Sequence, residues 1–224
     1  MLFQREFKGQ KFFISVLGTK RPVHVMRSFD LEQDVRNKWW NIQSNDCVLD
    51  IGAGFGSYTL TALALGANVL AVEPNPDEMF NLLTSLNSNN DYGFIDRCRL
   101  VNSLVGEGPC IAEYFPGTHS VRDDSKEAQT IMCVTLDYLV DVYLKGIVDW
   151  IKIDVEGMEA SVLKGAEKTL RTKKSKVIIE LHEGILPGVC EQVFKAMSGF
   201  GYYCKDQITG GGANEHWVLW ESSK

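Results

Sequence analysis

VLDIGAGFG, at residues 48–56, is the most informative sequence in this chain of 224 residues. An apolar run that stops at a glycine turn predicts a buried strand, and the residues after Gly56 have the spacing of a helix. Glycine is required where a backbone turns sharply and approaches a ligand closely, because a Cβ atom would collide there. The sequence therefore predicts a strand, a ligand-binding turn and a helix in succession.

Short apolar runs alternate with amphipathic segments from this motif to residue 198. This alternation predicts an α/β fold in which a mainly parallel sheet has helices on both faces. We expect strands at 47–51, 69–73, 99–101, 148–153 and 176–181. We expect helices at 57–65, 76–87, 158–170 and 189–198.

The last part of the chain breaks this alternation. Residues 201–205 and 217–221 are strand-like, and the short segment that joins them contains three consecutive glycines, 210–212. Strands joined so closely pair antiparallel, since a parallel pair needs a long crossover. A Rossmann-like, mostly parallel sheet that ends in one reversed hairpin strand is similar to the sheet of class I methyltransferases.

Residues 1–45 are expected to form an N-terminal extension to the main domain. Within it, residues 12–17 and 23–26 are expected to pair as a hairpin, and a helix follows. Asp30 with Gln33 makes a capping-box pair for the start of that helix.

Residues 46–224 are expected to form the main domain, with an insertion at about residues 104–135. The insertion contains strand-like pieces on either side of Gly117-Thr118-His119, which predicts a hairpin or flap. Insertions of this length in a compact domain are often functional, so His119 is a weaker candidate for contact with a substrate.

Candidate cofactor-binding residues gather at the ends of three predicted strands. Glu73 ends the second strand, where a carboxylate can accept hydrogen bonds from both ribose hydroxyls of an adenosine. Asn102 and Ser103 end the third strand, where they can bond an adenine ring. The expected set is Asp50, Gly52, Ala53, Gly54, Glu73, Pro74, Asn102 and Ser103.

Two residues favour S-adenosylmethionine over a nicotinamide dinucleotide as the cofactor. The dinucleotide fingerprint needs a third glycine or an alanine where this chain has Ser57. Asp50 suits S-adenosylmethionine, whose sulfonium and ammonium groups are positive, but would repel an anionic pyrophosphate. A nicotinamide-dependent oxidoreductase is therefore kept only as an alternative.

A second motif, IKIDVEGME at residues 151–159, continues into VLKGA at residues 162–166. ELH, at residues 180–182, ends the fifth strand. Over roughly residues 46–183 these motifs closely resemble the FkbM family of methyltransferases. The resemblance implies O-methylation of a hydroxyl on a small metabolite or a sugar. Many relatives read G-A-N-x-G at the glycine turn, where this chain has Gly52-Ala53-Gly54.

The expected catalytic residues are Asp154, Glu156 and His182, at the carboxyl ends of two neighbouring strands, where open α/β sheets bind ligands. His182 is the first choice for the base that takes the hydroxyl proton, because its unperturbed pKa of about 6.5 suits that task. A histidine bonded within its own loop is an equal alternative. A magnesium ion held by the three residues is a weaker alternative, and the preferred assignment contains no metal.

Lys152 lies in the fourth strand, on the same face as Asp154. A lysine in a central strand is costly unless it is paired. We therefore expect a structural ion pair with Asp50 or Glu180, which would hold the carboxylates around the transferring methyl group.

Composition and charge limit the possible partners. The net charge is −6 and the sequence pI is about 5.3, which disfavours binding to a phosphate backbone. No apolar run approaches the roughly 20 residues that cross a bilayer. The six cysteines include no C-x-x-C pair, which is typical of reduced thiols in a cytoplasmic protein. The expected partner is a small acceptor with a hydroxyl group, without nucleic acid or membrane; a non-catalytic module that binds S-adenosylmethionine remains a further alternative.

Overall fold

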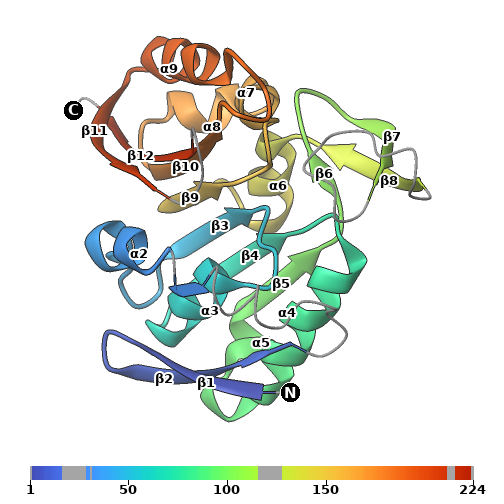
Figure 1. The fold of residues 1–224 in the computed structure, drawn as a ribbon, viewed down its shortest axis with the longest axis vertical. Helices are drawn as coiled ribbons and strands as arrows, with labels where there is room; N and C mark the ends of the chain where they lie inside the picture. Colours follow the sequence, from blue (N-terminus) through green and yellow to red (C-terminus); the bar gives the residue numbers. More distant parts are fainter. Residues whose placement is uncertain (1, 17–28, 31, 116–127, 211–214, 223–224) are drawn as a thin grey trace. The chain divides into compact units, whose positions relative to one another are not determined.

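The computed structural model describes residues 2–16, 29–30, 32–115, 128–210 and 215–222. The chain divides into two compact units, Met1–Asn102 and Ser103–Lys224. Strands and helices alternate in both units, as Figure 1 shows.

The first unit contains parallel strands and an N-terminal hairpin. Its elements are β1 (Leu2–Phe7), β2 (Gln10–Ser15), α2 (Gln33–Trp39), β3 (Cys47–Ile51), α3 (Ser57–Ala64), β4 (Asn68–Val72), α4 (Pro76–Ser88), the 3-10 helix η1 (Asn90–Tyr92), α5 (Phe94–Arg97) and β5 (Cys98–Val101). Strands β3, β4 and β5 are parallel neighbours in that order. The β1–β2 hairpin packs against α3 and α4.

The glycine motif forms the predicted strand, turn and helix. The apolar side chains of β3 are buried, and the turn that follows has positive φ at Gly52, Gly54 and Gly56. A Cβ atom at Gly56 would collide with the side chain of Leu82 on α4. Glycine is therefore required at this turn by the fold itself, before any ligand is considered.

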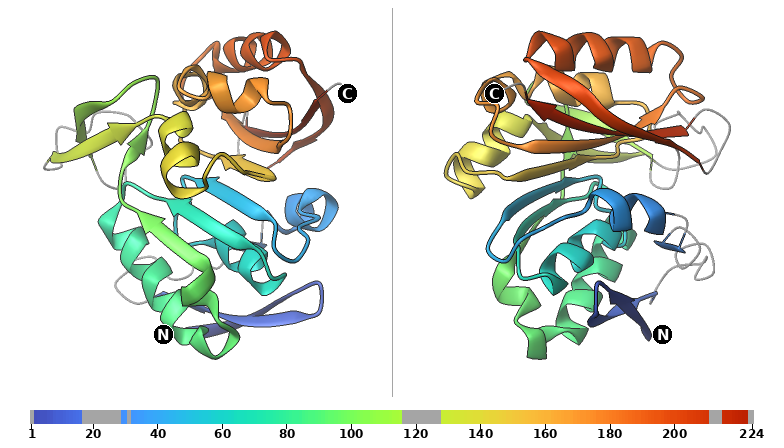
Figure 2. Two further views of the ribbon diagram at one scale, coloured as in Figure 1. Left: turned by 180° about the vertical axis from the view of Figure 1, so that it is seen from behind. Right: turned by 90° about the vertical axis from the view of Figure 1, so that its left-hand side faces the viewer.

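The second unit contains the reversed strand. Its elements are β6 (Leu104–Val105), β7 (Cys110–Tyr114), β8 (Gln129–Val134), α6 (Leu136–Tyr143), β9 (Trp150–Ile153), α7 (Glu159–Lys164), α8 (Glu167–Arg171), β10 (Lys176–His182), α9 (Val189–Gly199), β11 (Tyr202–Thr209) and β12 (Glu215–Ser222). Strands β9 and β10 are parallel, and β12 runs antiparallel between β10 and β11 (Figure 2). The predicted reversal near the end of the chain is confirmed.

The predicted insertion contains a small sheet of three strands. Strand β8 pairs antiparallel with β7 and parallel with β6. The segment around Gly117-Thr118-His119 lies outside the described residues.

The N-terminal segment contains a hairpin that the sequence did not predict. Residues 12–15 pair with β1, with Phe12 opposite Arg5, through a turn at Lys8 and Gly9 where φ is positive; the expected partner strand, 23–26, lies outside the described residues. The predicted capping box is wrong. Asp30 is itself helical, and Glu32 precedes α2 without any side-chain cap.

The helix predicted at 158–170 is two short helices, α7 and α8. The break falls at Gly165, where a Cβ atom would collide with the carbonyl oxygen of Gly106. The helix pattern gives no sign of this contact, because Gly106 lies far away along the chain.

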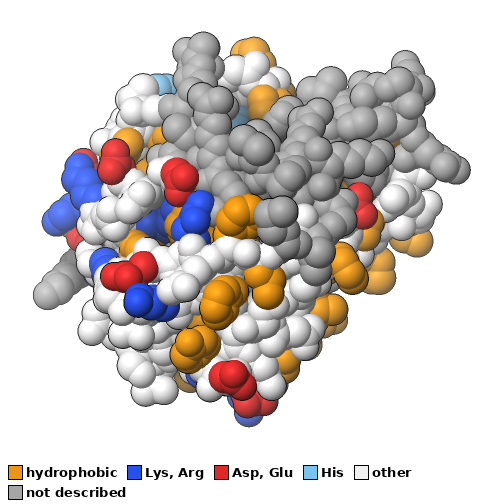
Figure 3. Space-filling model, turned by 60° about the horizontal axis from the view of Figure 1, so that its bottom comes forward, with side chains coloured by type: hydrophobic (Ala, Val, Ile, Leu, Met, Phe, Trp, Pro, Cys, Tyr) orange, Lys and Arg blue, Asp and Glu red, His pale blue; other side chains and the backbone are white. Residues whose placement is uncertain are grey.

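Three observations bear on partners and environment. Among the described residues, no helix combines the length and the apolar character needed to cross a bilayer. The six cysteines are all free thiols. On the face in Figure 3, the described basic and acidic side chains are interspersed rather than separated by sign.

Candidate functional site

Glu73 ends β4 and closes the glycine turn. Its Oε2 accepts a hydrogen bond from the backbone N–H of Gly54 at 2.8 Å, and Oε1 accepts one from that of Asn75 at 2.7 Å. The side chain is buried. The structure thus brings Glu73 and the glycine turn together, as the sequence predicts, but the bonds it records go to the backbone.

Asp50 is fully buried at the end of β3. Its Oδ2 accepts a hydrogen bond from the hydroxyl of Thr59 at 2.6 Å, which fixes the first turn of α3 to the strand. This bond gives Asp50 a structural role beside the electrostatic one expected from the sequence.

The predicted adenine contacts, Asn102 and Ser103, differ in their surroundings. The Asn102 amide donates to the carbonyl oxygens of Glu73 and Pro74 at 2.8 and 2.9 Å, so it joins the ends of β4 and β5. The Ser103 hydroxyl is buried, and no described residue forms a hydrogen bond with it. A buried hydroxyl without a partner is costly, so a hydrogen bond with a ligand would stabilise Ser103.

Glu78, in the first turn of α4, is a site residue that the sequence reasoning missed. An added Cβ at Gly54 would lie 3.5 Å from Glu78 Oε2, so this carboxylate faces the glycine turn together with Glu73. Burial, reinforced by the charge of Asp77, raises the pKa of Glu78. An acidic residue in the first turn after the second strand is the signal that could have found it.

A second polar cluster lies at the ends of β9 and β10, within the second unit. Lys152 is buried in β9, and its Nζ lies 2.9 Å from Asp154 Oδ2. The structure therefore records the expected kind of ion pair, with Asp154 as a partner of Lys152.

His182 is the centre of this cluster. Its Nδ1 lies 2.8 Å from Oε1 of Glu159, a carboxylate that is fully buried at the start of α7. Its Nε2 faces three further carboxylates: Glu156 at 3.4 Å, Asp154 at 3.7 Å and Glu180 at 3.9 Å. The three predicted catalytic residues are thus brought together, with Glu159 and Glu180 added.

These neighbours change the acid–base character of His182. Burial alone would lower its pKa, but the hydrogen bond with Glu159 and the charges of Asp154 and Glu156 raise the pKa to about 9. Burial alone would raise the pKa of Asp154, but Lys152 and His182 hold it below its usual range. The ordinary histidine pKa assumed from the sequence therefore does not apply.

Glu156 has a backbone conformation that few non-glycine residues adopt. Its φ is 52°, in the left-handed region, and the adjacent Gly157 has φ of 97°. The Gly157 N–H donates to Glu159 Oε1 at 2.9 Å, so the turn and the histidine share one buried carboxylate. Strained conformations of this kind cluster at active sites. Glu159 lies in the same sequence motif, which is the signal that could have identified it.

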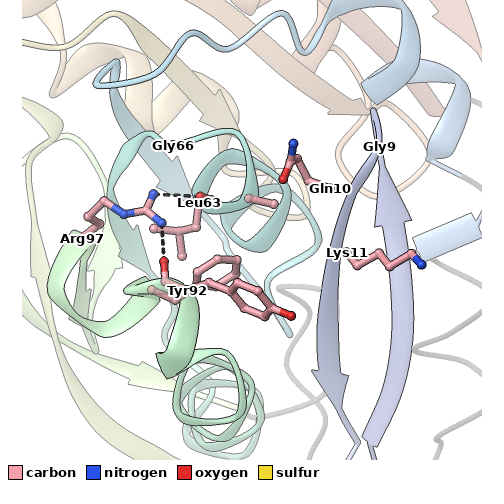
Figure 4. Close-up of a pocket in the computed structure, with 9 residues that line it drawn as sticks. Gly9, Gln10, Lys11, Leu63, Gly66, Tyr92 and Arg97 are labelled. Carbon is pink, nitrogen blue, oxygen red and sulfur yellow. Dashed lines mark hydrogen bonds between the residues drawn. The ribbon is translucent and has the colours of Figure 1, made fainter.

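A cavity of about 390 Å³ in the first unit is a poorer candidate for the site (Figure 4). It lies beside the end of α3 and the start of β2, away from the carboxyl ends of the strands where α/β folds bind ligands. Arg97, one of the two charged residues that line it, donates to the backbone carbonyls of Leu63, Ala67 and Tyr92. The guanidinium therefore has a structural role.

The fold, and the position of these polar residues at the strand ends, are those of class I methyltransferases. The model of the methyltransferase FkbM domain matches residues 50–203, and the chain belongs to this family. Hexuronic acid methyltransferase AglP of Haloferax volcanii is 34% identical over 163 residues, which cover 70% of this chain and 64% of that protein. This chain thus matches less than two thirds of the length of that relative.

Two solved structures show the same fold. A methyltransferase FkbM from Methylobacillus flagellatus aligns with a TM-score of 0.59 and 19% identity, covering 83% of this chain and 45% of that one. A putative rRNA-methylase from Clostridium thermocellum aligns with a TM-score of 0.55 and 13% identity, covering 89% and 96%. At these identities, the likeness concerns the fold alone.

Proposed function

We propose that this protein is an S-adenosylmethionine-dependent methyltransferase that methylates a hydroxyl oxygen of a sugar or another small metabolite. The observation that carries the proposal is the cluster of Asp154, Glu156 and the buried His182 at the carboxyl ends of two parallel strands. Membership of the FkbM family supports the same reaction.

Residues that follow or end strands β3, β4 and β5 fit the methyl donor. S-adenosylmethionine supplies an electrophilic methyl group on a positively charged sulfur. Glu73 and Glu78 both face the glycine turn and give it the negative potential that suits a cation. The donor would be bound by the turn at Gly52-Ala53-Gly54 together with Glu73 and Pro74. Asp50 would stabilise the end of β3 through its hydrogen bond with Thr59. Asn102 and the buried Ser103 hydroxyl are the candidates for the adenine.

Glu156 is the best candidate for the base that takes the hydroxyl proton. It is the most exposed of the four carboxylates around His182, with 38% of its side chain exposed, whereas the imidazole is buried. His182 and Asp154 would then position Glu156 and the acceptor. The sequence alone favours His182 as the base, whereas this assignment gives that role to Glu156.

A sugar acceptor is supported by the relative that acts on a hexuronic acid. A hexuronic acid offers both hydroxyl oxygens and a carboxylate oxygen. A neutral hydroxyl must lose a proton on transfer, and the carboxylates around His182 provide a base that can take it. We therefore favour a hydroxyl and the formation of a methyl ether.

The partner and location follow the same reasoning. The free thiols support a reducing, cytoplasmic location. The net charge of −6 supports a small-molecule acceptor over nucleic acid.

The test is a screen of hexoses and hexuronic acids for release of S-adenosylhomocysteine, followed by treatment of the product with mild alkali. We expect release with a sugar and a product that resists alkali, because a methyl ether is stable there. An alkali-labile methyl ester would overturn the hydroxyl assignment. Binding of S-adenosylmethionine without any transfer would instead favour a non-catalytic module.

A further inference from the structure

We infer that Asp154, Glu180 and His182 form a binding site for one divalent cation such as Mg²⁺ or Mn²⁺. The inference rests on the proposed function in one respect, since it assigns a ligand to the same site. Binding of the ion can nevertheless be measured without any methyl transfer.

The three side chains offer donor atoms that converge. One ligand atom from each lies within 4.8 Å of the others. Asp154 directly follows β9, while Glu180 and His182 alternate along the neighbouring parallel strand β10 and so share a face. Rigid strands therefore hold all three donors, which is the support that a preformed ion site needs.

The orientation of His182 is the second observation. Its buried ring is held through Nδ1 by Glu159, while Nε2 points at the carboxylates. Nε2 makes no hydrogen bond with any described residue, although it lies close to three oxygen atoms. Metal-binding histidines almost always donate their second N–H to a carboxylate or carbonyl in this way, which leaves the other nitrogen for the ion.

The charges at the site favour a cation. The two carboxylate oxygens of Asp154 have different partners. Oδ2 is paired with Lys152, and Oδ1 faces His182. Glu180 and Glu156 bring two more carboxylates to the same nitrogen. Negative groups this close repel one another in a poorly hydrated site, and a divalent ion between them removes that repulsion.

The donor set indicates the kind of ion. Two carboxylates and one imidazole leave several coordination positions for water or for a hydroxyl of the acceptor. Oxygen-rich, open sites suit Mg²⁺ and Mn²⁺, whereas closed sites of sulfur and nitrogen suit structural zinc. An ion here would hold the acceptor oxygen beside Glu156.

Mn²⁺ is the probe for the test, because free Mn²⁺ gives an electron paramagnetic resonance signal that disappears on binding. We expect metal-stripped protein to bind one Mn²⁺ per chain, in competition with Mg²⁺. Glu180→Gln and Asp154→Asn should each weaken Mn²⁺ binding at least tenfold. Glu159→Gln, which alters only the support of His182, should weaken it by about 10- to 100-fold.

Asp141→Asn is the matched control. Asp141 is an exposed carboxylate that pairs with Lys168 on the surface of the same unit. This variant should bind Mn²⁺ as the wild type does, and thermal melts should show that every variant folds. Absence of Mn²⁺ binding to the folded wild type would overturn the inference, and so would equal losses in Asp141→Asn and Glu180→Gln.

The result is separable from the proposed function. Methyl transfer that persists in EDTA, with no Mn²⁺ bound, would reject the ion site and retain the proposed methyltransferase function. Tight Mn²⁺ binding with no methylated sugar would retain the ion site and reject the proposed reaction.

Discussion

His182 illustrates how neighbours decide what a residue can do. The sequence correctly predicts that it lies with Asp154 and Glu156 at one edge, because motifs at the ends of neighbouring strands meet in this fold. The sequence could not reveal the buried carboxylate of Glu159 on its other nitrogen, which depends on how α7 packs. That contact is what moves the pKa of the imidazole to about 9.

The left-handed backbone conformation of Glu156 leads to a prediction about stability. Replacing a left-handed glutamate by glycine relieves strain of roughly 1–3 kcal/mol, which offsets the extra chain entropy that glycine adds. Glu156→Gly should therefore unfold in urea at the wild-type midpoint or above it, whereas Glu156→Gln keeps the strain. A marked loss of stability in the glycine variant would show that Glu156 has a structural role.

Lys152 permits a direct comparison between a buried and an exposed ion pair. Lys152→Met leaves Asp154 among other carboxylates and should lower the free energy of unfolding by about 3 kcal/mol. Lys164→Met removes an exposed pair with Glu107 and should cost about 1 kcal/mol or less. Urea titrations of both variants provide the measurement, and equal losses would contradict the assignment.

Glu73 tests the donor site. Glu73→Ala should weaken S-adenosylmethionine binding by about 1.5–3 kcal/mol, the value of a charge-assisted hydrogen bond. The variant also frees the Gly54 N–H, so the turn itself becomes less ordered. Glu113→Ala, on the exposed strand β7, is the control. Unchanged affinity by calorimetry would remove Glu73 from the site.

At the scale of elements, local patterns predict local structure and fail at distant contacts. Strand β3 has the predicted bounds, since its apolar run and glycine turn are adjacent in sequence. The pairing of β2 with β1 was missed because Lys8-Gly9 is a weaker turn signal than Asn-Gly or Asp-Gly. The break at Gly165 was missed because it depends on the backbone of Gly106.

This break leads to a prediction about the α7–α8 pair. Gly165→Ala forces a methyl group against the Gly106 carbonyl and should destabilise the protein by about 1–3 kcal/mol, as overpacking does. Gly199→Ala, at the end of α9, meets no atom within 4 Å and should be neutral or stabilising. A melting temperature that is equal in the two variants would show that the backbone at Gly165 can move aside.

At the scale of the whole molecule, the two units carry different chemistry. The first unit holds the glycine turn with Glu73 and Glu78, which suit a cationic donor. The second holds the carboxylates around His182, which suit an acceptor that must lose a proton. We propose that the glycine turn binds the donor and that the cluster around His182 activates the acceptor.

The most direct test measures both properties in Glu156→Gln. We predict that calorimetry will give the wild-type affinity for S-adenosylmethionine, because Glu156 belongs to the His182 cluster and not to the glycine turn. Turnover on the sugar found in the screen should fall by about 10²- to 10⁴-fold, as expected when a general base is lost. Wild-type turnover, or a loss of donor affinity that accounts for the whole loss of turnover, would contradict the claim.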